Sequence, residues 1–248
     1  MNPEPAAPRR VPEGLKAPER SPREVTKRRW DYVLGYHVFA RLMRLWFRFY
    51  ARWEVIGLEN APRSGPLLIA ANHTSNVDPL MGWAAIYGTR RMWGVSKSEL
   101  WNNPASAYLM GCIGTIPVHR GAADRAMLRR ALELLSVGEA VGIFPEGTRS
   151  YDGKLNAPQP GVALLIQKSG APVLPVGIVG TQEMLPRGAK KMKRVPLKIA
   201  FGKPLTFPPN AKRDEILTAI MAAIAELMTA NGQPTEPPAP DRKPLAED

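Results

Sequence analysis

Short apolar runs alternate with segments of helical pattern through most of this 248-residue chain, and this alternation constrains the fold more than any other feature. The apolar runs predict β-strands at 53–57, 66–71, 91–95, 113–118, 140–145, 173–179 and 195–201. Helical patterns lie between them, at about 79–87, 104–110, 122–137 and 161–169, with a last one at 214–229. This order predicts an α/β fold with a mostly parallel central sheet flanked by helices. In such a fold the functional site lies at the carboxyl ends of the strands.

The two ends of the chain have a different composition. Residues 1–29 contain six prolines and eight Lys or Arg residues, and this composition predicts a disordered basic arm. Residues 231–248 contain five prolines and no apolar period, and they predict a disordered tail. The rest of the chain divides into a helical segment, 30–53, and one globular domain, 54–230.

Residues 30–53 predict an amphipathic helix with a stripe of arginines. Arg41, Arg44, Arg48 and Arg52 fall within about 80° of helical arc, and aromatic and aliphatic side chains fill the opposite side. Such a helix either packs on the core with a solvated Arg face or lies in a membrane interface, where Trp and Tyr reach headgroup depth. The wide apolar face and the basic arm before it favour the membrane-interface helix.

The positive charge of the chain is concentrated in two segments. The formal net charge is +12, from 34 Lys and Arg against 22 Asp and Glu. Residues 1–53 hold 12 basic and 5 acidic residues, and residues 187–213 hold 9 basic residues and no acidic one. Such patches attract nucleic acid or anionic lipid, although basic runs also occur as a plain solubilising surface.

Cysteine content and the lack of long apolar segments indicate the cellular compartment in which the protein works. Cys112 is the only cysteine, which excludes a disulfide within the chain and a zinc site built on several thiolates. No run approaches 18 apolar residues, so we expect no transmembrane helix, and the first residues lack the apolar segment of a secretory signal. These features predict a reducing, cytosolic-side location.

The first chemical motif, NHTSNVDP at residues 72–79, directly follows an apolar run. His73 therefore lies just past the carboxyl end of a strand, and Asp78 precedes Pro79 in a pattern typical of a helix N-cap. Across a strand–turn–helix junction the two side chains can meet. A carboxylate on one imidazole nitrogen fixes the tautomer and stabilises the imidazolium that forms when the other nitrogen takes a proton. The alternative is that Asp78 only caps a helix and His73 is only a polar turn residue.

Three further motifs lie on or directly after other apolar runs. FPEGTRS at 144–150 places a carboxylate, a glycine, a hydroxyl and a guanidinium in one turn, where backbone N–H groups and Arg can grip an anion. GTIPVHR at 114–120 is a strand that ends in Arg120, a side chain that can hold phosphate. PVLPVG at 172–177 is read as a buried strand with a structural role near the pocket. Each of these motifs alone is also compatible with an ordinary turn or strand.

Together and in this order, the four motifs resemble the boxes of the glycerolipid acyltransferase family typified by lysophosphatidic acid acyltransferase. NHTSNVD is similar to that family's NHxSxxD box, GTIPVHR to its second box, FPEGTRS to its third and VLPVGI to its fourth. The resemblance covers about residues 53–205 and identifies 54–230 as an acyltransferase domain.

The resemblance also implies roles for individual residues. His73 would be the general base and Asp78 its orienting partner. The substrate-binding residues would be Lys97, Arg120, Glu146, Gly147, Thr148 and Arg149; among them, Lys97 stands in a K-x-E-L run similar to one that meets phosphate in the family. Many members carry a lysine a few residues beyond the third box, where this chain has Gln159, and this departure bears on the identity of the acceptor.

The implied reaction moves a fatty acyl chain from acyl-CoA or acyl-carrier protein to the free hydroxyl of 1-acylglycerol-3-phosphate and gives phosphatidic acid. A lyso-ornithine lipid or another lysolipid is the alternative acceptor. An acyl thioester is already activated, so we expect no bound cofactor, no metal ion and no covalent intermediate. Cys112 has no cationic neighbour in sequence, and Ser75 lies outside any G-x-S-x-G motif, which argues against either as a nucleophile.

Because the implied acceptor is a lipid, we expect a monotopic enzyme on the cytoplasmic face of the cell membrane. Residues 30–53 and the cluster 187–213 would meet anionic lipids. A nucleic-acid-binding protein would also explain the basic segments, but it would leave His73 and the third box without a role, and no nucleic-acid module is recognisable. We therefore expect no nucleic-acid partner.

Overall fold

The computed structural model describes residues 30–118, 125–186 and 188–238. The predicted basic arm, the segment 119–124 with Arg120, Arg187 and residues 239–248 lie outside the described residues.

Seven strands form one sheet in the described part of the chain. They are β1 (Glu54–Ile56), β2 (Leu67–Ala71), β3 (Met92–Lys97), β4 (Thr115–Val118), β5 (Ala140–Ile143), β6 (Val173–Val179) and β7 (Lys198–Phe201). Their order across the sheet is β1-β7-β6-β2-β5-β3-β4. Neighbours pair in parallel except β6 and β7, which are antiparallel. The five adjacent strands from β6 to β4 therefore run in one direction, and their carboxyl ends share one edge of the sheet.

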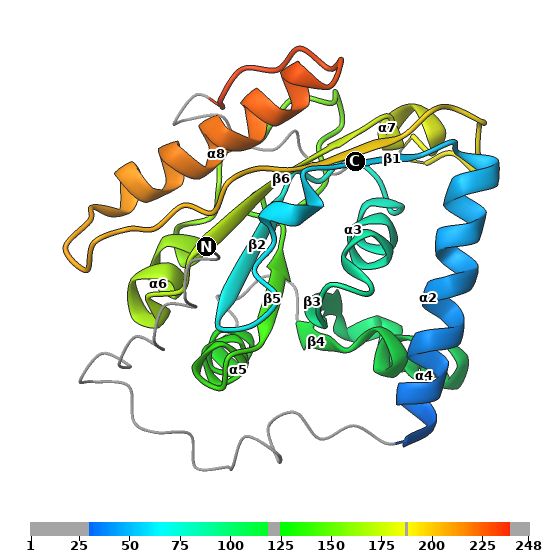
Figure 1. Cartoon of the computed structure of the whole chain (residues 1–248), viewed down its shortest axis with the longest axis horizontal. Coiled ribbons are helices and arrows are strands. Elements are labelled where there is room, and N and C mark those ends of the chain that lie inside the picture. The colour runs from blue at the N-terminus through cyan, green and yellow to red at the C-terminus, as the bar shows by residue number, and fades with distance from the viewer. Residues whose placement is uncertain (1–29, 119–124, 187, 239–248) are drawn as a thin grey trace, which may run out of the picture.

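Helices cover both faces of this sheet (Figure 1). One face carries α5 (Arg125–Ser136), α6 (Pro160–Ser169) and α8 (Arg213–Ala230). The other face carries α2 (Trp30–Tyr50), α3 (Asp78–Ile86) and α4 (Pro104–Ile113). The short helix α7 (Thr181–Met184) follows β6, and two 3₁₀ turns, η1 (Leu58–Asn60) and η2 (Ser98–Trp101), complete the described elements.

Strand β2 shows how the sheet separates two cores. Leu68 and Ala70 pack in the core beneath α5, α6 and α8. Leu67, Ile69 and Ala71 pack in the core beneath α2 and α3. All five side chains are buried, as is typical of a parallel strand with helices on both of its faces.

The predicted α/β fold with a mostly parallel sheet is confirmed. The run predicted at 173–179 coincides with β6 at both ends. The run predicted at 195–201 is shorter in the structure, because β7 begins at Lys198 after Pro196, which has no backbone N–H to give to a ladder. The sequence analysis did not predict α7, η1, η2 or the antiparallel pairing of β6 with β7.

The inner side of α2 packs on the domain. Tyr36, Ala40 and Phe47 are buried in the core that α2 shares with α3. Arg44 also turns inward, and its Nη1 donates to the carbonyl oxygens of Ala84 at 2.9 Å and of Ala85 at 3.3 Å. Because the last carbonyl groups of α3 have no N–H donors within the helix, Arg44 satisfies them. The four arginines predicted as one stripe are therefore divided, with Arg44 turned toward the domain and Arg41, Arg48 and Arg52 exposed.

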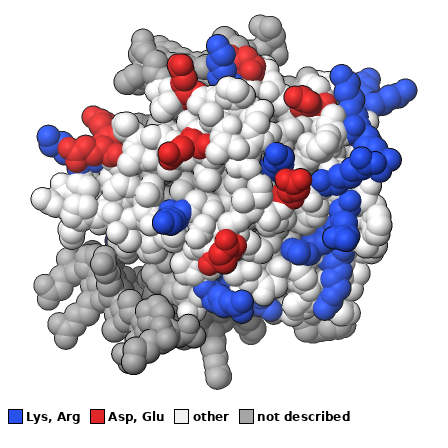
Figure 2. Space-filling model, turned by 45° about the horizontal axis from the view of Figure 1, so that its top comes forward, with Lys and Arg blue, Asp and Glu red and all other residues white. Residues whose placement is uncertain are grey.

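The outer side of α2 is apolar and exposed. Five large side chains along it are 50–66% exposed, and we call them the outer stripe: Leu34, Val38, Leu42, Leu45 and Phe49. Arg41 and Arg48 lie exposed beside the stripe, and Met192 is 49% exposed next to the end of the helix, where its carbonyl accepts from Tyr50 Oη at 3.3 Å. Lys and Arg side chains gather on the α2 side of the molecule (Figure 2). Within the described residues, none of the helices combines the length and the apolar character that crossing a bilayer would require.

Part of the predicted tail lies on the domain. Gln233 Nε2 donates to the carbonyl oxygen of Gly153 at 3.0 Å, and the backbone N–H of Thr235 donates to Thr229 Oγ1 at 3.0 Å. Gln233 and Thr235 are therefore held by hydrogen bonds to Gly153 and to the end of α8, a feature that composition alone does not reveal.

Candidate active site

The site residues come from the carboxyl ends of three adjacent parallel strands. His73 lies two residues after β2, Glu146 lies three residues after β5, and Lys97 is the last residue of β3. Because β2, β5 and β3 are neighbours in the sheet and run in parallel, their ends meet at one edge. These three residues therefore lie at one edge of the sheet, as expected for functional residues that follow parallel strands.

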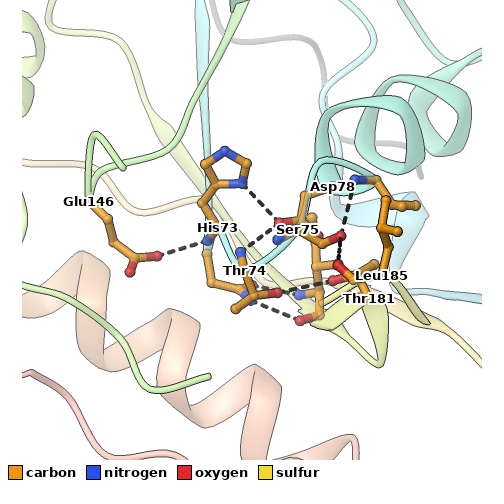
Figure 3. Close-up of polar contacts among 10 residues, drawn as sticks. His73, Thr74, Ser75, Asp78, Glu146, Thr181 and Leu185 are labelled. Carbon is orange, nitrogen blue, oxygen red and sulfur yellow. Dashed lines mark hydrogen bonds and ion pairs between the residues drawn. The ribbon is translucent and has the colours of Figure 1, made fainter. Parts of the chain in front are cut away.

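His73 and Asp78 form a direct contact across the turn between β2 and α3 (Figure 3). The distance from His73 Nδ1 to Asp78 Oδ2 is 2.9 Å. The Asp78 side chain is fully buried, whereas the His73 side chain is 16% exposed. The pair thus has a buried carboxylate behind an imidazole that solvent can reach.

The turn around Asp78 is folded onto its carboxylate. Oδ2 also accepts from the backbone N–H groups of Thr74 and Ser75, both at 2.7 Å. The structure differs here from the predicted N-cap, since Asp78 is the first residue of α3 and Val77 holds the cap position. The side chain turns back to the loop because the loop offers two N–H donors and an imidazole. The amino end of α3 further favours a negative charge at this place.

The contact leaves one imidazole nitrogen for chemistry. A carboxylate oxygen can only accept a hydrogen bond, so Nδ1 carries the proton and Nε2 of a neutral ring keeps its lone pair. In Figure 3 the second ring nitrogen points away from Asp78. This arrangement can take a proton from a nucleophile at Nε2 and stabilise the resulting imidazolium through Asp78.

The third box holds His73 from the opposite side. Glu146 Oε1 accepts from the backbone N–H of His73 at 2.8 Å, and the N–H of Ser150 donates to the carbonyl oxygen of His73 at 2.7 Å. The Phe144 ring stacks on the imidazole with 3.9 Å between centroids and 15° between planes. The first and third boxes are therefore parts of one site.

Gly147 is a position in the third box that needs glycine. Its φ of +71° is unfavourable for other residues, and a Cβ there would lie 2.8 Å from Gln159 Cγ. Gln159 itself donates from Nε2 to the carbonyl oxygen of Glu146 at 3.3 Å. In this chain Gln159 therefore lies against the third box.

The other predicted substrate-binding residues lie in two places. Thr148 and Arg149 are half-buried in the same loop as Glu146 and Gly147. Lys97 is exposed at the end of β3. Arg120 follows β4 in sequence and lies outside the described residues.

The structure adds polar residues that the motif analysis did not assign. Ser75 Oγ donates to the carbonyl oxygen of Leu185 at 3.0 Å, and Thr74 Oγ1 lies 3.1 Å from Thr181 Oγ1. Asn72 exchanges two hydrogen bonds with the backbone of Ile178, at 2.7 and 2.9 Å. These contacts tie the first box to β6 and α7. The only signal in the sequence was that three polar residues, Asn72, Thr74 and Ser75, stand in the first box without a role in the proposed chemistry, which is compatible with a structural role.

An apolar cavity lies beneath the His73–Asp78 pair, between α3 and the sheet. Asp78 and Phe144 contribute to its wall near the pair, and Gly82, Met92 and Gly142 are among the residues that line it further in. A Cβ at Gly82 would meet no atom within 4 Å, which means that the cavity passes close to this turn of α3. The site thus joins a polar pair to an apolar recess.

A family model described as acyltransferase matches residues 52–179, just over half of the chain. The fold and site described above thus belong to a known class, and the chain is a member of the acyltransferase family.

Several curated relatives and a solved structure are similar to this chain. A chloroplastic 1-acyl-sn-glycerol-3-phosphate acyltransferase of Brassica napus is 29% identical over 208 residues, which cover 79% of this chain and 57% of the relative. A 1-acyl-sn-glycerol-3-phosphate acyltransferase of Bacillus subtilis is 29% identical over 153 residues, which cover 61% of this chain and 73% of the relative. The chain spans little more than half the length of the first relatives it matches. The crystal structure of the LPA acyltransferase PlsC from Thermotoga maritima shares the fold, with a TM-score of 0.69, 24% identity and 79% of each chain covered.

Proposed function

We propose that this protein transfers a fatty acyl chain from a thioester donor to the free hydroxyl of 1-acylglycerol-3-phosphate and so forms phosphatidic acid. The observation that carries the proposal is the 2.9 Å contact between His73 Nδ1 and buried Asp78 Oδ2 in a member of the acyltransferase family. The printed names of the relatives support the choice of acceptor.

In the proposed mechanism His73 acts as a general base. The acceptor hydroxyl donates its proton to Nε2 while its oxygen attacks the thioester carbonyl carbon. A C–O bond forms, the C–S bond breaks, and the departing thiolate takes the proton back from Nε2. Asp78 holds the ring and balances the positive charge that the imidazolium carries between these two transfers.

The acceptor phosphate would be held by cations at the same sheet edge. Lys97 at the end of β3 and Arg149 in the third box are the described candidates, and Arg120 after β4 is a third. Thr148 would add a hydroxyl, whereas the backbone N–H of Gly147 already donates to the carbonyl oxygen of Phe144 at 3.0 Å. Arg and Lys stabilise a phosphate dianion well when the site is partly shielded from water.

The apolar cavity gives a place to a fatty acyl chain next to the base. Its walls are formed mainly by aliphatic, aromatic and glycine residues, and it reaches Asp78 and Phe144. A chain that enters the cavity releases water from its own surface at roughly 0.8 kcal/mol per methylene. This gain would position the reacting end of the acyl chain near His73.

The donor is proposed to be acyl-CoA or acyl-carrier protein, and the place of action the cytoplasmic face of a membrane. The outer stripe would enter the lipid interface, and Arg41, Arg48 and the basic residues 190–194 would meet anionic headgroups. The inner side of α2 packs on the domain, so α2 would serve both as a core helix and as an interfacial helix.

Mass spectrometry of lipid products tests the acyl transfer. Purified protein is incubated with a mixture of lysolipids, including 1-acylglycerol-3-phosphate and a lyso-ornithine lipid, and with acyl-CoA or acyl-carrier protein. We expect phosphatidic acid as the main product. A product only from lyso-ornithine lipid would move the protein to the alternative acceptor, and no acylated product from any pair would contradict the proposal.

Vesicle sedimentation tests the membrane contact. Wild-type protein should pellet with vesicles that contain anionic phosphatidylglycerol, and high salt should release it only in part because the apolar contact is not screened. Leu45→Ser with Phe49→Ser should weaken binding about 100-fold, since two half-exposed apolar side chains lose roughly 3 kcal/mol of interfacial burial. Pelleting of the double variant like wild type would exclude the outer stripe as the contact. Equal binding to duplex DNA, fully reversed by salt, would favour a general affinity for polyanions.

A further inference from the structure

Glu146 is a buried carboxylate whose two oxygens are both used within the protein. Its side chain is fully buried. Oε1 accepts from the backbone N–H of His73 and Oε2 accepts from the backbone N–H of Asn156, each at 2.8 Å. Burial of a carboxylate is costly unless hydrogen bonds replace its water, and these two contacts contribute to that replacement.

The backbone of His73 depends on the third box because β2 has already ended. The ladder of β2 with β5 stops at Ala70, and its ladder with β6 stops at Ala71. Two residues later, the N–H of His73 is bound by Glu146 and its carbonyl oxygen by the N–H of Ser150. Glu146 and Ser150 therefore replace the strand neighbours that would otherwise fix this residue.

The direction of these contacts sets Glu146 apart from the rest of its box. Its oxygens face the backbone of His73 and Asn156, whereas an acceptor headgroup would carry a phosphate dianion. A carboxylate that touched such a headgroup would repel it. The positive and neutral groups of the box, Gly147, Thr148 and Arg149, are chemically suited to that contact.

We propose that Glu146 is a positioning residue: it clamps the backbone of His73 to that of Asn156 and so sets the place of the catalytic imidazole, without contact to the acceptor. This proposal rests on the proposed function for its kinetic consequences. Its structural part, the clamp between two backbone N–H groups, stands on the geometry alone.

The substitution Glu146→Gln distinguishes a residue that positions His73 from a residue that contacts the acceptor. The amide oxygen can accept from one backbone N–H, but the amide NH₂ then faces the other N–H, donor against donor. A displacement of His73 of about 1 Å should lower the rate roughly 10–100-fold. We expect kcat to fall by this factor while KM for 1-acylglycerol-3-phosphate and for the acyl donor changes less than about threefold.

Glu146→Asp provides a second comparison, because it keeps the charge but shortens the side chain by one methylene. A clamp needs the length, so kcat should fall in this variant as well. Glu133→Gln is the matched control, since Glu133 pairs with Arg130 on the surface of α5 at 3.1 Å and has no contact with the site. It should keep wild-type values.

Amide hydrogen exchange of the His73 and Asn156 N–H groups, followed by NMR, gives a readout that does not depend on activity. At least one of the two amides should exchange at least tenfold faster in Glu146→Gln, and both should exchange as in wild type in the Glu133→Gln control. Unchanged exchange of both amides would overturn the clamp, and a tenfold rise in acceptor KM at constant kcat would instead make Glu146 an acceptor contact. Absence of acyl transfer by wild-type protein would instead contradict the proposed function and leave the exchange experiment to decide the clamp.

Discussion

Replacement of Asp78 by asparagine removes the charge behind His73 while keeping the shape of the side chain. Asp78 Oδ2 accepts three hydrogen bonds, from His73 Nδ1 at 2.9 Å and from the N–H groups of Thr74 and Ser75 at 2.7 Å. Hydrogen bonds to an ionised acceptor contribute about 1 kcal/mol more than neutral ones. The free energy of unfolding should therefore fall by about 3 kcal/mol in Asp78→Asn.

The effect of the same change on catalysis should be larger, because only the charged carboxylate stabilises the imidazolium. Loss of this stabilisation should reduce kcat about 10²–10⁴-fold, or roughly 3–5 kcal/mol in the transition state. Initial rates of phosphatidic acid formation at saturating substrates measure kcat, and urea unfolding measures the free energy of unfolding. Asp214→Asn, at the exposed start of α8, is the matched control.

A kcat within threefold of wild type would refute the role given to Asp78. A fall in kcat that disappears when the assay is run well below the unfolding transition of the variant would show that stability alone was affected.

Two further perturbations probe the cavity and the sheet. A Cβ at Gly82 would meet no atom within 4 Å, so Gly82→Leu should extend into the cavity and cut the rate with long acyl donors at least tenfold more than with short ones. Gly161→Leu, at an exposed position of α6, should leave chain preference unchanged; mixed-chain competition assays measure the preference. Arg90 donates to the carbonyl oxygens of three loop residues at 2.7–3.0 Å, and burial lowers its pKa, partly offset by Glu139. Arg90→Ala should lower the free energy of unfolding by about 2–4 kcal/mol in urea, and Arg90→Lys should restore only part of it because one ammonium cannot match the planar fork.

The location of the candidate site could be predicted from sequence because its residues directly follow apolar runs. His73 and Glu146 stand two and three residues after strands, and the alternation of strands with helices implies parallel neighbours. Parallel strands bring their carboxyl ends together, so two motifs 73 residues apart could be placed at one edge. The arrangement followed from periodicity and topology, without knowledge of any side-chain contact.

The contacts within the site could not be predicted in the same way. The donors to Glu146 are backbone N–H groups of His73 and Asn156, and nearly every residue offers such a group. The contact between Asp78 and His73 was the exception, because the sequence analysis already paired them, but the N–H donors of Thr74 and Ser75 to the same carboxylate were not predicted. Thr181 lies 107 residues from Thr74, and a contact over that distance leaves no local pattern.

The sequence pattern also could not predict which side of α2 packs on the domain and which side is exposed. Both sides of this helix carry large apolar residues, and hydrophobic periodicity does not distinguish a side that packs on α3 from one that faces outward. Arg44 shows the difficulty, since its guanidinium binds carbonyl groups at the end of α3 although its spacing places it in the Arg stripe.

The rate of phosphatidic acid formation by His73→Ala, compared with wild type in one assay, tests the central claim most directly. Substrates are 1-acylglycerol-3-phosphate and acyl-CoA, the product is measured by mass spectrometry, and thermal unfolding confirms that the variant is folded. The account predicts measurable turnover by wild type and a loss of about 10²–10⁴-fold in the variant, because His73 Nε2, backed by Asp78, is the proposed acceptor of the hydroxyl proton. A folded His73→Ala protein with turnover within tenfold of wild type would contradict it.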